Sequence, residues 1–111
     1  MSIKIETYII TGIKLNEEQT NIVFENEYFE KISTYHKKDG IRALTDGMNG
    51  LYTWVGLIEK IDLDSEEIDL NMFYKPDSFK GHMMSEIRDV LPEEFKNLNF
   101  ELKTVLFNHY V

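Results

Sequence analysis

The sequence contains no cysteine, which excludes disulfide bridges, thiolate catalysis and cysteine metal sites. It holds only two prolines and six glycines, a composition that argues against a disordered chain. No apolar run reaches the ~18 residues of a membrane span, and the alternating N-terminus is unlike a signal peptide. We therefore expect a folded, cytoplasmic protein that does not bind membranes.

The length and net charge of the chain indicate how many domains it forms and what kind of partner it binds. A chain of 111 residues predicts one domain, residues 1–111, large enough to bury roughly two-thirds of its unfolded surface. Twelve Lys and Arg against twenty Asp and Glu give a net charge of −8. This charge disfavours direct binding to nucleic acids, and it favours a protein partner with a basic surface.

A turn and the apolar run that follows it lie at the centre of the predicted fold. Asp46-Gly47 and Asn49-Gly50 enter turns readily because glycine adopts positive φ without steric cost. From Leu51 to Ile61 both alternating sets of side chains are apolar, which predicts a central strand covered on both faces. Further strands are predicted over residues 3–14, with the odd-numbered side chains buried, and over residues 41–45, 67–74 and 98–107.

The first helix is predicted from a capping signal. Asn16 and Gln19 have the spacing of a capping box, which places the helix start at Glu17. A later start near Glu25 is the alternative, because β-branched residues weaken the first turns. Gly40 is a suitable helix end.

A second helix is predicted between Pro76 and Pro92, with an apolar stripe along one side. The expected fold is therefore α+β, with a mainly antiparallel sheet of four to five strands and two helices in a ferredoxin-like βαββαβ order. The alternative is another α+β topology in which residues 41–45 form a full member of the sheet.

If both helices cover one face of the sheet, apolar and aromatic residues collect on the other face. These residues are Tyr8, Ile10, Tyr52, Trp54, Ile58, Phe73 and Phe107, together with Val105. Exposed apolar patches of this size are unusual in a soluble monomer. The face therefore predicts an interface with a partner protein or a second copy of the chain, with Trp54 and Tyr52 as anchors. The alternative is that a helix or loop of the same chain covers it.

Acidic residues form two clusters along the chain. The first comprises Glu17, Glu18, Glu25, Glu27 and Glu30, and the second comprises Asp62, Asp64, Glu66, Glu67 and Asp69. Regular negative charge can imitate a phosphate backbone and occupy the basic groove of a nucleic-acid enzyme. The alternative is an ordinary solvated acidic surface.

The usual signatures of catalysis and cofactor binding are missing. The acidic run after Ile61 fails as a calcium-binding EF-hand loop, because Glu67 and Phe73 occupy the positions of the glycine and the closing acid. His36, His82 and His109 have no metal-ligand spacing. No phosphate-binding loop or nucleophile elbow occurs. We expect no catalytic residue, metal or cofactor, and hence a non-enzymatic protein.

Residues 46–50, followed by Tyr52, Val55 and Gly56, resemble a segment of small uncharacterised bacteriophage-encoded proteins. The resemblance covers only Asp46 to Gly56. It implies a phage or mobile-element accessory protein that binds, and inhibits, a host protein such as a defence or nucleic-acid enzyme. Two alternatives stay open: a small-ligand-binding domain or minor enzyme with a cleft beside residues 46–50, and a phage structural or assembly subunit.

Overall fold

The computed structural model describes residues 5–25, 27–45, 52–61, 69, 71 and 75–110. The described chain has an α+β fold on one antiparallel sheet, which confirms the predicted class. Its strands are β1 (Ile5–Leu15), β2 (Ile41–Thr45), β3 (Thr53–Ile61) and β4 (Lys103–Tyr110). Its helices are α1 (Glu17–Phe24), α2 (Glu27–Lys31), α3 (Asp77–Val90) and the short 3-10 helix η2 (Glu93–Phe95).

The sheet has the strand order β2-β3-β1-β4, and every neighbouring pair is antiparallel. The predicted central strand is confirmed over Thr53–Ile61, because β3 lies between β2 and β1, while Leu51 lies outside the described residues. Residues 41–45 form a full strand of the sheet, as the alternative expected for that segment. Most of the strand predicted over residues 67–74 lies outside the described residues, and neither Asp69 nor Asn71 belongs to a strand.

The capping box predicted at the start of the first helix is present. Asn16 Oδ1 accepts a hydrogen bond from Gln19 N at 2.8 Å, and Gln19 Oε1 accepts one from Asn16 N at 2.9 Å. The reciprocal bonds satisfy two amides that a helix start leaves without partners. The helix therefore begins at Glu17, and the later start near Glu25 is wrong.

The prediction that this helix continues to Gly40 is wrong. The chain leaves the helical path after α2 and pairs with β2 instead. Ala43 N donates to Ile32 O at 2.9 Å, and Thr34 N donates to Ala43 O at 3.0 Å, around a parallel bridge between Ser33 and Ala43. These strand-like hydrogen bonds replace the helical bonds that the apolar spacing had favoured.

The last strand begins at Lys103, five residues later than predicted. Arg88 of α3 explains part of this difference, because its Nη1 donates to Lys96 O at 2.8 Å and to Leu98 O at 3.1 Å. These two bonds hold the segment after η2 close to the end of α3. Phe100 and Leu102 then pack against the core on the helix side of the sheet rather than extending the strand.

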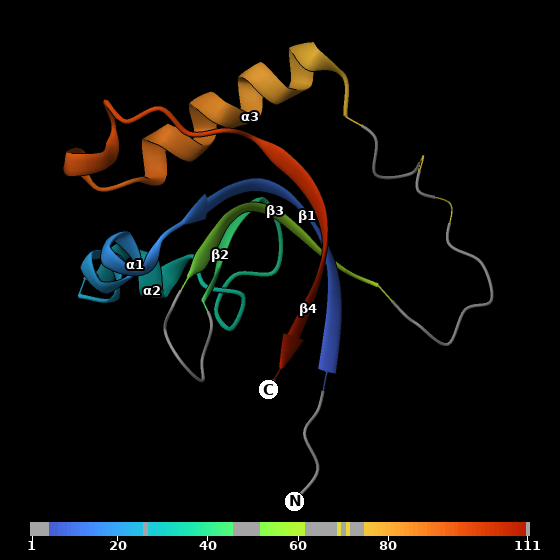
Figure 1. Cartoon of the computed structure of the whole chain (residues 1–111), viewed down its shortest axis with the longest axis horizontal. Coiled ribbons are helices and arrows are strands. Elements are labelled where there is room, and N and C mark those ends of the chain that lie inside the picture. The colour runs from blue at the N-terminus through green and yellow to red at the C-terminus, as the bar shows by residue number, and fades with distance from the viewer. Residues whose placement is uncertain are drawn as a thin grey trace, which may run out of the picture.

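The sheet is bent into an arch, with α3 over its outer side and α1 and α2 beside one end (Figure 1). The helices pack on the outer face through one apolar core, which we call the helix-side core. It contains Ile13, Leu15, Val23, Phe29, Ile32, Ile41, Ala43, Val55, Met83, Ile87, Leu91 and Phe95. The predicted stripe on α3 is confirmed at Met83 and Ile87, whereas Phe79 at its start is exposed. None of the described helices has the length and apolar character needed to cross a membrane.

Candidate interaction surface

The inner face of the arch carries a second apolar cluster, separate from the helix-side core. We call it the inner cluster, and it consists of Tyr8, Ile10, Leu44, Trp54 and Ile58, with Tyr52, Val105 and Phe107 packed against it. Alternation along the strands places these side chains opposite the helices. The predicted grouping is therefore confirmed for every member that the structure describes. Phe73 lies outside the described residues.

The expectation that this face is exposed is wrong. Trp54 is only 5% exposed, and Tyr8, Ile10 and Ile58 are buried as well. These side chains form one cluster and are covered within a single chain. The argument that only a partner could cover these residues therefore no longer holds. Their assignment as interface anchors has no support from exposure.

Aromatic packing holds the inner cluster together. The ring of Phe107 meets Tyr52 edge-on at a centroid distance of 5.4 Å and lies 6.2 Å from the ring of Trp54. Lys14, which is paired with Trp54 across the β1–β3 ladder, holds its ammonium 5.2 Å from the Tyr52 centroid and 5.9 Å from the Trp54 centroid. The exposed lysine thus holds its positive charge over both aromatic rings.

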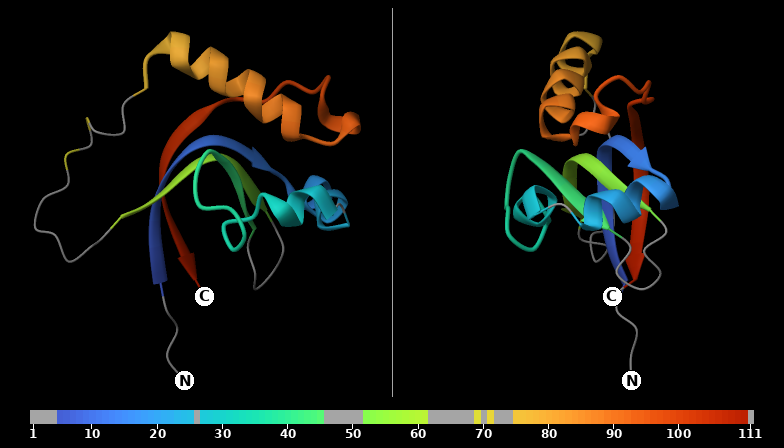
Figure 2. Two further views of the ribbon diagram at one scale, coloured as in Figure 1. Left: turned by 180° about the vertical axis from the view of Figure 1, so that it is seen from behind. Right: turned by 90° about the vertical axis from the view of Figure 1, so that its left-hand side faces the viewer.

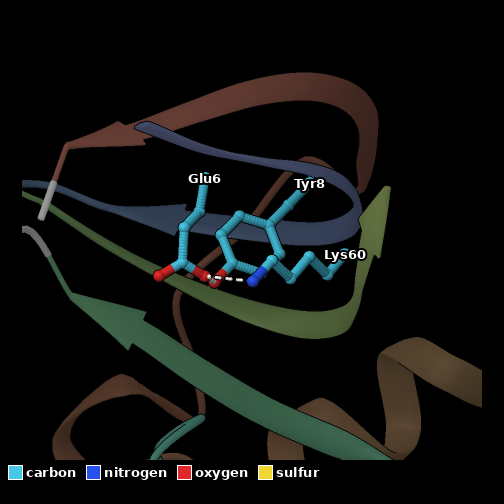
Figure 3. A network of polar contacts seen from close by, with 3 residues as sticks. All are labelled: Glu6, Tyr8 and Lys60. Carbon is cyan, nitrogen blue, oxygen red and sulfur yellow. Dashed lines mark hydrogen bonds and ion pairs between the residues drawn. The ribbon is translucent and has the colours of Figure 1, made fainter. Parts of the chain in front are cut away.

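A polar network lies on the inner face near the start of β1 (Figure 3). Tyr8 Oη donates to Glu6 Oε2 at 2.8 Å, and Lys60 Nζ pairs with the same oxygen at 3.0 Å. Burial raises the pKa of the Tyr8 phenol to about 12, and the hydrogen bond to Glu6 adds to this effect. At neutral pH the Tyr8 phenol is therefore protonated and donates its hydrogen bond to Glu6.

Arg42 is a structural residue that sequence reasoning missed. Its Nη1 donates to Lys37 O at 3.2 Å, and its Nη2 donates to Ile58 O. Lys37 Nζ in turn donates to Ile41 O at 3.0 Å. The two basic side chains tie the segment before β2 to β2 and β3. The sequence offered one sign of this structural role, namely a single arginine in the otherwise uncharged residues 41–45.

The residues of the two predicted acidic clusters that the structure describes are exposed to solvent. Glu17 and Glu18 lie in the first turn of α1, Glu25 caps its end, and Glu27 and Glu30 lie on α2. Asp69 is exposed too, while Asp62, Asp64, Glu66 and Glu67 lie outside the described residues. Whether the two predicted clusters form one surface is therefore not decided. The first cluster follows the two short helices.

The outer edge of β4 is the feature that sequence reasoning overlooked. Within the described part of the chain β4 has a strand neighbour only on its β1 side, so it forms a border of the sheet. Figure 2 shows β4 at the opposite border of the sheet from β2. Leu106 on this strand is 64% exposed, and Ile5 on the adjacent strand β1 is 51% exposed. We call β4 and these two side chains the β4 edge.

The composition of β4 makes this edge unusual. After Lys103 the strand reads Thr-Val-Leu-Phe-Asn-His-Tyr, without Asp, Glu, Lys, Arg, Pro or Gly. Edge strands of monomeric proteins normally carry charges, prolines or bulges that prevent pairing with another chain. The opposite edge, β2, is only five residues long and is already bridged at Ala43. An uncharged run of β-forming residues was the sequence signal that could have revealed the β4 edge.

One shallow hollow lies elsewhere, beside α2, with a volume of about 440 Å³. Its lining residues Glu27, Glu30, Lys31 and His36 are all exposed, so it offers little apolar enclosure to a ligand. No group of three or more metal-ligating side chains occurs among the residues that the structure describes. The predicted cleft beside residues 46–50 lies outside the described residues.

Comparison with known proteins found no match to any family model, curated protein or solved structure.

Proposed function

We propose that this chain is a non-enzymatic protein-binding module that accepts a strand of another polypeptide along β4. The observation that carries the proposal is an eight-residue edge strand with only one charged residue, Lys103. An antiparallel edge offers alternating N–H and C=O groups, and an added strand satisfies both. The edge supplies the hydrogen bonds, and the neighbouring side chains supply selectivity.

The side chains at the β4 edge suit such an addition. Leu106 faces Ile9 across the β1–β4 ladder, and Ile5 lies on the same face of β1. Both side chains lie in the half of the sheet that is farther from α1. Residues 104–110 pair with residues 5–11 of β1, whereas α1 follows the other end of that strand. Two exposed apolar side chains at this border of the sheet favour a partner strand with apolar residues at alternate positions.

We also propose a ferredoxin-like topology and a phage or mobile-element origin for this chain. The strand order and the single helix-covered face support a ferredoxin-like arrangement. The proposal of a phage or mobile-element origin, with a host protein as the inhibited target, rests on the resemblance of residues 46–56. The exposed glutamates of α1 and α2 are compatible with a basic partner. Ligand binding in the hollow beside α2 is less favoured because its lining side chains are exposed.

A peptide titration tests the strand-addition proposal. The probe is a synthetic peptide with the sequence of residues 102–110, and its matched control carries proline at the position of Leu106. Proline removes an amide and cannot sit inside a ladder. In nuclear magnetic resonance spectra of the dilute labelled chain, we expect the probe to shift the amide signals of β4 and its neighbours, and the control to leave them unchanged. If both peptides leave β4 unchanged, the strand-addition proposal is wrong.

A further inference from the structure

We infer that the occupant of the β4 edge is a second copy of this chain, placed by a two-fold axis normal to the sheet at Leu106. This inference rests on the proposed function, because it names the partner of the same edge. Two β4 strands then run antiparallel, and the two four-stranded sheets join into one continuous sheet.

Backbone geometry makes the edge complementary to itself. In an antiparallel ladder every second residue directs both its N–H and its C=O away from its neighbour. A two-fold axis normal to the sheet reverses the strand and keeps each face on its own side. The donors of one copy therefore meet the acceptors of the other. With the axis at Leu106, residues 103–109 of the two copies pair, which gives a ladder of about 23 Å at ~3.3 Å per residue.

Charge favours a second copy over a basic partner at this edge. Each chain carries −8, so two copies can approach closely only where charge is absent. Residues 104–110 contain no Asp, Glu, Lys or Arg, and they pair with the half of β1 that is remote from Glu17 and Glu18. Lys103 already has an acidic neighbour, with its Nζ 3.7 Å from Glu101 Oε2. A basic partner would gain more by meeting the exposed glutamates of α1 and α2.

The side chains locate the axis. Leu106 is the fourth residue of the eight in β4 and is among the most exposed apolar residues that the structure describes. In the proposed pairing it lies opposite its own copy, and the two Ile5 side chains extend the apolar strip on either side. Contact through one edge strand and a few side chains buries a small surface area compared with most specific protein interfaces. The dimer is therefore weak and depends on concentration.

A single-cysteine experiment tests this arrangement. The natural chain has no cysteine, so Leu106→Cys introduces its only thiol. Residues on the axis have Cα atoms about 4.5–5.5 Å apart, within the ~4.4–6.8 Å that a disulfide spans. We expect Leu106→Cys to form a covalent dimer rapidly under mild oxidation. The matched control, Ile22→Cys, places an exposed thiol on α1 and should remain monomeric.

Sedimentation of the unmodified chain over a range of concentrations gives the second measurement. We expect a monomer–dimer equilibrium that strengthens with added salt, because salt screens the repulsion between two acidic chains. Leu106→Glu should weaken the dimer at least roughly tenfold, since like charges then face each other across the axis. Ile22→Glu should leave the equilibrium unchanged.

The outcomes separate this inference from the proposed function. A chain that stays monomeric at every concentration, yet binds the peptide of residues 102–110, overturns the second-copy inference and leaves the strand-addition proposal in place. A dimer that cross-links equally well through Ile22→Cys overturns the assigned axis. Failure of both the peptide titration and self-association overturns both.

Discussion

Gly12 of β1 lies directly opposite Gly56 of β3, at the centre of the inner face of the sheet. A Cβ atom at Gly12 would lie 2.2 Å from Val55 O, and one at Gly56 would lie 2.3 Å from Thr11 O. The two backbones thus approach more closely than any side chain permits. We attribute the bend of the arch to this pair, because glycines are the residues that allow strands to kink.

Substitution of either glycine should therefore destabilise the fold. We expect Gly12→Ala and Gly56→Ala each to lower the free energy of unfolding by about 2–4 kcal/mol, since the clash is with backbone atoms that cannot move aside. The matched control is Gly81→Ala on α3, where a Cβ meets nothing within 4 Å. That change should raise stability by up to ~1 kcal/mol, because alanine favours a helix. Urea denaturation measures all three, and equal effects at the three sites would contradict the close-approach argument.

Trp54 should behave as a core residue. We expect Trp54→Ala to cost about 3–5 kcal/mol of stability, the range for large buried aromatics. Trp54→Phe should cost less, because among the described residues Trp54 Nε1 is buried without a hydrogen-bond partner, and its loss removes an unsatisfied donor. Since this is the only tryptophan, its fluorescence reports on the inner cluster directly. Emission typical of a solvent-exposed indole, or a stable Trp54→Ala chain, would show that the cluster is open.

The Tyr8 phenol should titrate later than an ordinary tyrosine. Its pKa rises from 10.0 to about 12 in the folded chain, so the folded state favours the protonated form. The resulting stabilisation is complete below pH ~10 and is lost as the pH rises through about 12. Ultraviolet absorbance during alkaline titration should show one late-ionising tyrosine that Tyr8→Phe removes. Glu6→Gln should lower its pKa, because the nearby negative charge is lost; an unchanged titration curve would exclude Glu6 as a cause.

The capping box at the start of α1 should contribute measurably to stability. We expect Asn16→Ala to lower the free energy of unfolding by about 0.5–2 kcal/mol, because Gln19 N loses its acceptor, the Asn16 Oδ1 atom. Asn21→Ala is the matched control, since Asn21 is exposed within the same helix and caps nothing. It should be neutral or slightly stabilising. A comparable loss from both substitutions in thermal unfolding would argue against a specific cap.

The alternation of apolar side chains along the strands and the capping residues of α1 were sufficient to predict much of the fold. The pattern around Trp54 predicted a central strand, and Asn16 with Gln19 predicted the start of α1. The same alternation grouped Tyr8, Ile10 and Trp54 on one face, as observed. These features depend on residues close together in the chain, where spacing alone determines which side chains share a face.

Exposure of that face could not be predicted in the same way. The burial of Trp54 depends on side chains of other strands, among them Tyr8 of β1 and Leu44 of β2, which meet it only through the register of the sheet. The free edge of β4 likewise depends on strand order, which no single segment of sequence contains. The end of α2 depends on a bridge between Ser33 and Ala43. Each of these features arises from contacts between distant parts of the chain.

The two borders of the sheet differ, and this difference limits how far an assembly could grow. On one border, the segment around Ser33 already occupies β2 at Ala43. At the opposite border, β4 has no further strand beside it within the described chain. Head-to-tail stacking would need an open strand on both sides of every molecule. Association through this sheet should consequently stop at a closed pair instead of continuing into a fibre.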